Sequence, residues 1–160
     1  MKIKIICIGK IKEKYIEDFI SEYTKRLGAF CNLNILEFKE IPPSKTFPKE
    51  RSIKEEGEII LKNISTDDFV IAMDEKGKEF SSIEFSKIIK THNDVGVTLC
   101  FIIGGPYGLC DEVRSRANSI ISLSKMTFTH NMARIFLIEQ IYRGFCIISG
   151  KEYHNGRNII

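Results

Sequence analysis

Residues 124–143 have the sequence SKMTFTHNMARIFLIEQIYR, which begins as a polar loop and continues as a long helix. A surface helix normally has one apolar stripe and one charged face. This helix, followed to Phe145, instead carries large apolar side chains nearly all round: Met132, Ile135, Phe136, Leu137, Ile138, Ile141, Tyr142 and Phe145. We therefore expect it to be buried on more than one side, with a second subunit covering one of them.

The rest of the chain alternates short apolar runs with helical patterns. The strand-like runs cover residues 3–8, 32–38, 69–73, 95–103 and 119–124. Helices are predicted over residues 10–27, after Pro48, after Ser81, over 111–118, and from about 130 to near Gly150. Continuous apolar strands alternating with helices favour a parallel sheet covered on both faces. The pattern predicts an α/β fold, a parallel-rich sheet flanked by helices, in one domain spanning residues 1–160.

Composition excludes several classes of protein. Hydrophobic residues make up 43% of the chain, too many for a disordered protein. No apolar run approaches the roughly 18 residues of a membrane span, so we expect no membrane partner. The five cysteines form no Cys-x-x-Cys pair, which favours buried thiols in a cytoplasmic protein over disulfides or a metal site. A net charge of +3 permits an anionic partner such as RNA without requiring one.

Ligands of an open α/β sheet bind outside the carboxyl ends of its strands. Three such ends are unusual here: Met73–Asp74, the glycine-rich run 104–108 (GGPYG), and residues 123–125. The glycines would let a ligand approach the backbone closely, although the same run would also suit a tight strand-to-helix turn. It is neither a dinucleotide fingerprint after the first strand nor a phosphate-binding loop.

The polar residues of the last helix each have two interpretations. His130 follows a predicted cap, Thr129, and could be structural or catalytic. Arg134 and Arg143 could be surface charges, salt bridges between subunits, or phosphate contacts. Glu139 lies among apolar neighbours and must pair or titrate when buried. An ion pair with Arg143, four residues on, would satisfy it.

The tail that follows, residues 150–157 (GKEYHNGR), is too polar to form core. It could be a frayed terminus, or an aromatic and basic arm that stacks on a base and holds phosphate. Spacing alone leaves both interpretations open.

Several motifs occur in a fixed order along essentially the whole chain. They are IGGPYGL at 103–109, LSKMTFTH at 123–130, LIEQIYR at 137–143 and Tyr153–His154, after an N-terminal IGK at 8–10. In this combination the sequence resembles the bacterial large-subunit rRNA (pseudouridine N3)-methyltransferase family of the SPOUT class. It departs from that family at Thr129, where proline is frequent, and in continuing past His154 to Ile160.

The resemblance implies a C-terminal trefoil knot and a homodimer, neither of which general topology rules would predict. It implies S-adenosylmethionine as methyl donor and no metal. The matching donor-binding positions are Met73, Gly104, Leu123, Ser124, Lys125, Met126, Thr127 and Phe128. The implied substrate is a pseudouridine of 23S rRNA, methylated at N3 on the assembled ribosome.

Methyl transfer to this ring nitrogen requires removal of its proton, or stabilisation of the anion. The candidate catalytic residues are His130, Glu139, Arg143 and His154; the candidate substrate contacts are Arg134, Tyr153 and His154. A different class of function would be a non-catalytic ribosome-binding or assembly factor with the same fold. A nucleotide-binding oxidoreductase is disfavoured because no glycine fingerprint follows the first strand.

Overall fold

The structure, a computed structural model, describes residues 1–153. A five-stranded parallel sheet has the strand order β2–β1–β4–β3–β5. The strands are β1 (Lys2–Ile8), β2 (Asn32–Phe38), β3 (Phe69–Glu79), β4 (Leu99–Ile103) and β5 (Ser119–Ser122). The helices are α1 (Lys14–Leu27), α2 (Lys49–Lys62), α3 (Ser82–Asp94), α4 (Asp111–Arg116) and α5 (His130–Ile148).

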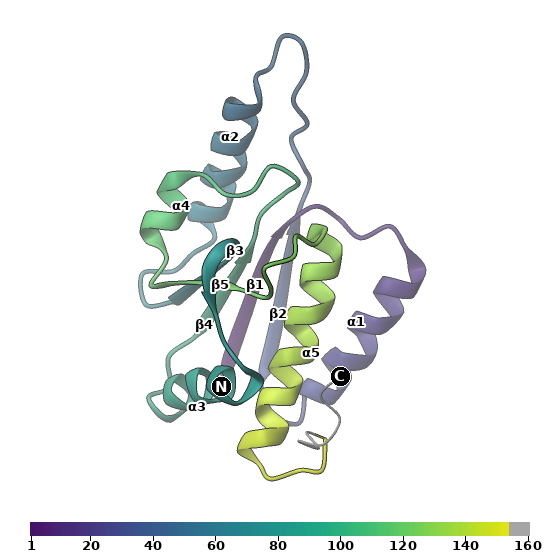
Figure 1. Ribbon diagram of the computed structural model, residues 1–160, viewed down its shortest axis with the longest axis vertical. Coiled ribbons are helices and arrows are strands. Elements are labelled where there is room, and N and C mark those ends of the chain that lie inside the picture. Colours follow the sequence, from purple (N-terminus) through teal and green to yellow (C-terminus); the bar gives the residue numbers. More distant parts are fainter. Residues whose placement is uncertain (154–160) are drawn as a thin grey trace.

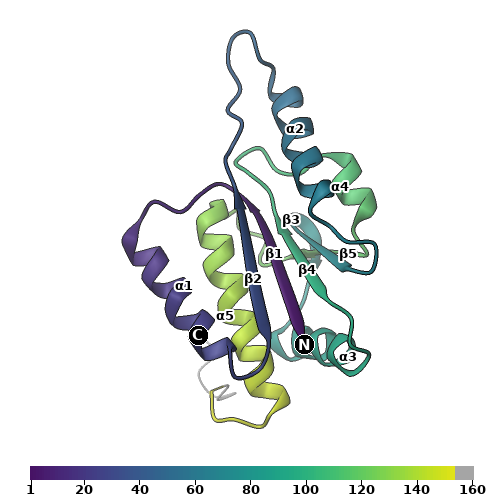
Figure 2. The same cartoon turned by 180° about the vertical axis from the view of Figure 1, so that it is seen from behind.

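The sheet lies between two layers of helices (Figures 1 and 2). Successive side chains of a strand point to opposite faces, and β1 buries both sets. Ile5 belongs to the core shared with α1, α3 and α5, whereas Ile6 belongs to the core shared with α2 and α4. Both side chains are fully buried. The predicted parallel sheet covered on both faces is therefore confirmed.

Helix α5 begins after Thr129, whose hydroxyl accepts a hydrogen bond from the Met132 N–H, so the predicted cap is confirmed. Leu137, Ile138 and Ile141 are fully buried. Phe136, in contrast, is 37% exposed. The helix is thus buried against the sheet and its neighbouring helices, and one apolar face remains open within a single chain.

Strand β3 differs from the predicted strand 69–73 followed by a turn at 74–78. It continues to Glu79, with a shift of register between Met73 and Lys78. A Cβ on Gly77 would lie only 2.6 Å from the Ile121 carbonyl carbon, so the backbone of β3 packs directly against β5 where pairing resumes after the bulge. The prediction of a turn at residues 74–78 was wrong. This part of β3 packs through its backbone, so its side chains show no apolar periodicity in the sequence.

The other element boundaries follow the sequence more closely. The predicted capping box at Ser81 and Glu84 is confirmed. Strand β4 begins at Leu99 and not at Val95, which directly follows α3 and is 67% exposed. All five cysteines are free. Across residues 1–153 no helix is both long and apolar enough to cross a membrane. The trefoil knot stays a prediction.

Candidate functional site

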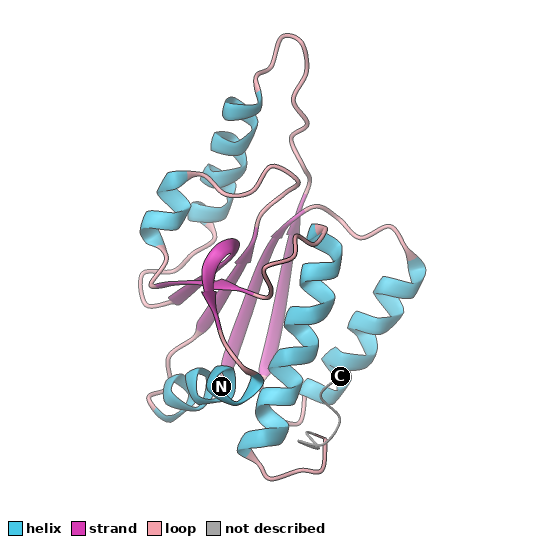
Figure 3. Ribbon diagram, in the orientation of Figure 1, coloured by secondary structure: helices cyan, strands magenta, loops and turns pink. Residues whose placement is uncertain are grey.

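The three predicted donor-binding segments meet at one edge of the sheet. Met73 pairs with Ile103 of β4 and with Ile121 of β5. Gly104 directly follows Ile103, and Leu123 comes two residues after Ile121. The bulge of β3 and the loops that follow β4 and β5 therefore start beside one another at the carboxyl edge. Figure 3 shows these strands and loops in the fold.

The glycine-rich loop is a tight turn. The Gly108 N–H donates to the Gly105 carbonyl at 3.0 Å, and Gly108 has a φ of +84° that favours glycine. A Cβ on Gly104 would lie 2.8 Å from the Gly108 carbonyl oxygen. No side chain fits at position 104 without opening the turn.

Asp74 and Arg114 join this turn to β3 at the start of its bulge. The Arg114 guanidinium donates to Asp74 Oδ2 at 2.7 Å and also to the Leu109 carbonyl. Burial opposes ionisation of Asp74, but hydrogen bonds from the Lys76 N–H and from Arg114 outweigh it and hold the pKa below its usual value. The ion pair was missed from sequence, although an acid directly after a buried strand was a usable signal.

Residues 123–128 form the third wall. The Ser122 hydroxyl closes a short turn, because it donates to the Ser124 carbonyl and accepts from the Ser124 N–H. Thr127 donates to the Glu75 carboxylate at 2.7 Å, which ties this loop to the bulge of β3. Met126 is 74% exposed and Phe128 36% exposed. The loop is thus fixed on one side and open on the other.

His130 and Arg134 lie where β1 and β2 end. Arg134 is fully buried, paired with the Glu37 carboxylate, and donates to the Gly9 carbonyl at 2.8 Å. His130 Nε2 lies 3.2 Å from Glu40 Oε1. The interpretation of Arg134 as a surface charge is therefore wrong. Its role as a substrate contact stays a prediction, and its burial favours a role in positioning the start of α5.

Glu139, Arg143 and Tyr153 form a second cluster. The expected Glu139–Arg143 ion pair is confirmed. The Tyr153 hydroxyl donates to Glu139 Oε1 at 3.1 Å and lies 2.9 Å from the Tyr23 hydroxyl, while the Arg143 guanidinium lies 4.8 Å from the centre of the Tyr153 ring. Tyr153, the last residue that the structure describes, thus packs on the α5 of its own chain. His154 lies outside the described residues.

The two clusters are far apart within one chain. A helix rises about 1.5 Å per residue, which puts Arg143 roughly 20 Å along α5 from His130. The second cluster therefore does not reach the three donor-binding loops of its own subunit.

Glu56 was also missed. Its side chain is 3% exposed, and Oε1 accepts from the Ile41 N–H at 2.8 Å. Oε2 is buried without a hydrogen-bond partner among residues 1–153, and a Cβ on Gly105 would lie 3.0 Å from it. Burial raises the pKa of this carboxyl. The sequence feature that could have identified Glu56 is an acidic residue beside Gly57 on the apolar face of α2.

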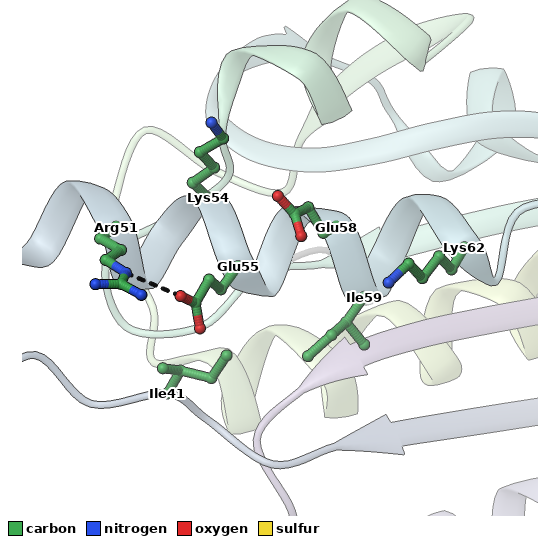
Figure 4. A pocket seen from close by; sticks show the side chains of 7 residues that line it. All are labelled: Ile41, Arg51, Lys54, Glu55, Glu58, Ile59 and Lys62. Atoms are coloured by element: carbon green, nitrogen blue, oxygen red, sulfur yellow. Dashed lines mark hydrogen bonds and ion pairs between the residues drawn. The ribbon is translucent and has the colours of Figure 1, made fainter.

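A groove of about 490 Å³ follows the outer face of α2 and is a different feature (Figure 4). Its lining carries both signs of charge, including the Arg51–Glu55 ion pair at 3.0 Å, and contains none of the predicted site residues. Over the described part of the chain, no group of three or more His, Cys, Asp or Glu side chains is arranged to hold a metal ion.

Comparison with known proteins gives concordant results. A family model described as "Predicted SPOUT methyltransferase" matches residues 1–154. The ribosomal RNA large subunit methyltransferase H of Clostridium botulinum (strain Kyoto / Type A2) is 48% identical over 158 residues, covering 96% of this chain and 99% of the relative. The enzyme of that name from Clostridium tetani (strain Massachusetts / E88) is 47% identical over 161 residues, with the same coverage.

A solved structure extends the comparison to the fold. A probable methylase family protein from Haemophilus influenzae Rd KW20 superposes with a TM-score of 0.55, covering 96% of this chain and 70% of that one. At 15% sequence identity the likeness concerns the fold alone.

Proposed function

Since the chain belongs to the SPOUT methyltransferase family, we propose that it methylates large-subunit ribosomal RNA at N3 of a pseudouridine. The observation that carries this proposal is the meeting of the Met73, Gly104 and 123–128 segments at one edge of the sheet, in a chain that matches the family over residues 1–154. The pseudouridine loses its N3 proton and gains the methyl group, and the donor leaves as a neutral thioether. The reaction would take place in the cytoplasm, on ribosomes.

The donor-binding residues are proposed to be Met73, Gly104 and the run 123–128. S-adenosylmethionine would supply an electrophilic methyl group on its sulfonium. It carries no phosphate, so a phosphate loop is not needed. The tight glycine turn leaves no side chain over Gly104, and the neighbouring loop is held from one side by the Thr127–Glu75 bond. These features suit a ligand held by backbone groups.

The bulge of β3 is where we place the trefoil knot. Beyond this bulge the Gly77 backbone lies against Ile121, and Thr127 of the loop after β5 bonds Glu75. We propose that the chain leading into α5 threads through the loop formed here, because a trefoil knot requires such threading.

We also propose a homodimer formed through α5. Met132 and Phe136 lie one turn apart on α5, and the ring of Phe128, in the preceding loop, packs on the Phe136 ring with centroids 4.9 Å apart. The three side chains are 39%, 37% and 36% exposed, which makes a continuous apolar strip. A two-fold axis perpendicular to α5 would pair this strip with itself and run the two helices in opposite directions. Glu139, Arg143 and Tyr153 of one subunit would then approach the donor loops of the other.

The proton at N3 has two candidate acceptors among the described residues. His130 is held by Glu40 at the start of α5, next to the loops of its own subunit. Glu139 is held by Arg143 and Tyr153 and would come from the partner. A positioned base would contribute roughly 100- to 10,000-fold to the rate.

The test uses ribosomes from a strain that lacks the gene. Purified protein with labelled donor should add one methyl group, which mass spectrometry of 23S rRNA should locate at N3 of a pseudouridine. Deleting residues from Tyr153 onward should abolish this transfer while calorimetry still detects donor binding. A folded protein that binds ribosomes but transfers no label would show a non-catalytic ribosome-binding factor instead.

A further inference from the structure

We propose that residues 39–54, here called the basic arm, contact phosphates of the ribosomal RNA substrate. This inference rests on the proposed function and adds a substrate-binding surface separate from the C-terminal tail. The arm comprises the loop between β2 and α2 and the first turns of α2. Figures 1 and 2 both show this loop projecting beyond the rest of the molecule.

Charge distinguishes the arm from the remaining surface. It contains five basic and two acidic residues, a net charge of +3, which equals the net charge of the entire chain. The remainder of the protein is therefore neutral overall. Such a concentration of positive charge on a projecting segment is the electrostatic pattern of a nucleic-acid contact.

The tip of the arm is a closed turn. Ser44 and Phe47 exchange two backbone hydrogen bonds, N–H to carbonyl, at 2.8 and 3.2 Å, which leaves Lys45 and Thr46 at the tip. The Arg51 guanidinium packs over the Phe47 ring at 4.8 Å. A preformed turn loses less conformational entropy on binding than a flexible loop does.

The base of the arm is fixed to α2 because both backbone polar groups of Ile41 form hydrogen bonds with side chains of that helix. The Ile41 N–H donates to Glu56, and the Ile41 carbonyl accepts from the Ser52 hydroxyl. Glu56 also packs against Gly105 of the glycine turn. This contact places the arm at the same edge of the sheet as the donor-binding loops.

Lys49 connects the arm to the glycine turn directly. Its ammonium lies 5.3 Å from the centre of the Tyr107 ring, and Tyr107 is 45% exposed. Within residues 1–153 neither Lys45 nor Lys49 lies within 4 Å of a carboxylate. Both ammonium groups are therefore available to phosphates of an RNA that reaches the site.

The test compares Lys45→Gln/Lys49→Gln with a matched control, Lys87→Gln/Lys90→Gln, on exposed positions of α3. Ribosomes that lack the methyl group are the probe, and binding is measured by sedimentation between 50 and 300 mM salt (about the range in which such contacts are screened). Each lost phosphate contact should lower the slope of log affinity against log salt by about 0.9 and weaken binding roughly fivefold at 0.15 M salt.

The arm variant should therefore show a KM for ribosomes raised roughly 25-fold, with kcat and donor affinity unchanged. The control should stay within about twofold of wild type, because exposed ion pairs such as Lys90–Asp94 contribute little. An unchanged slope and KM would overturn the inference. Weaker binding with an unchanged salt slope would also overturn it, by indicating a ribosomal protein as the contact. Because sedimentation measures binding alone, the arm is tested even if wild-type protein transfers no methyl group.

Discussion

Arg134 is a fully buried charge on which the start of α5 depends. Replacing it with alanine leaves Glu37 and the Gly9 carbonyl without their partner. The Glu37 side chain is 34% exposed and can be hydrated, so the expected cost is that of losing a hydrogen bond to a charged group, about 1.5–3 kcal/mol. We expect urea unfolding of Arg134→Ala to show a loss of that size. Lys14→Ala, which removes an exposed pair with Asp18, should lose less than about 1 kcal/mol; equal losses would contradict a structural role for Arg134.

Glu56 allows a pH test at a single residue. Its folded pKa is raised by burial from an ordinary value of 4.5. The free energy of unfolding is therefore highest when the Glu56 carboxyl is protonated, and it falls as pH rises from 4.5 through the folded pKa. Glu56→Gln keeps an acceptor for the Ile41 N–H but carries no charge, so its stability relative to wild type should increase across that window. If the ratio of the wild-type unfolding constant to that of Glu56→Gln did not change with pH, the raised pKa of Glu56 would be contradicted.

Truncating the same side chain separates the hydrogen bond from the charge. Glu56→Ala leaves the buried Ile41 N–H without its acceptor, at a cost of about 1–3 kcal/mol. Sequence could place Glu56 on the inner face of α2, but not its contacts, because Ile41 and Gly105 are brought to it only by tertiary packing. Arg134 shows the same limit: its partners come from strand ends far away in the chain.

At the scale of elements, apolar periodicity was sufficient for the strands and helices that bury a regular face. It failed at the second half of β3, where the packing depends on Gly77 having no side chain. Gly77→Ala would put a Cβ 2.6 Å from the Ile121 backbone. The Ile121 backbone is held by its pairing with β3 and cannot move away freely. We therefore expect a loss of about 3 kcal/mol, with weaker donor binding because the loop 123–128 follows β5.

Gly96→Ala is the matched control for this substitution. Gly96 has a φ of +72° and no atom within 4 Å of an added Cβ. Its replacement measures conformational strain alone, about 1–2 kcal/mol. Thermal unfolding monitored by circular dichroism compares the two. A Gly77→Ala protein at least as stable as Gly96→Ala would mean that β3 and β5 can separate without cost.

At the scale of the whole molecule, the open apolar strip on α5 determines the expected assembly. Phe136→Asp places a charge in the proposed two-fold interface, and sedimentation should show a monomer with unchanged helix content. Methyl transfer should fall by at least about 100-fold, since the site needs both subunits. Val95→Asp, at another exposed apolar residue, should remain a dimer. An active Phe136→Asp monomer would refute the shared site.

A shared site also predicts complementation between two inactive variants. Gly104→Val breaks the donor loops and keeps the tail, whereas Tyr153→Ala keeps the loops and breaks the cluster at Glu139. In a two-fold dimer the mixed species contains one site with both defects and one with neither. Random mixing makes half of the dimers mixed, so co-refolded protein should recover about a quarter of wild-type activity. If each site were built from one chain, every site in every mixture would carry a defect and no activity would return. The roughly 20 Å that separate His130 from Arg143 along α5 of one chain favour recovery.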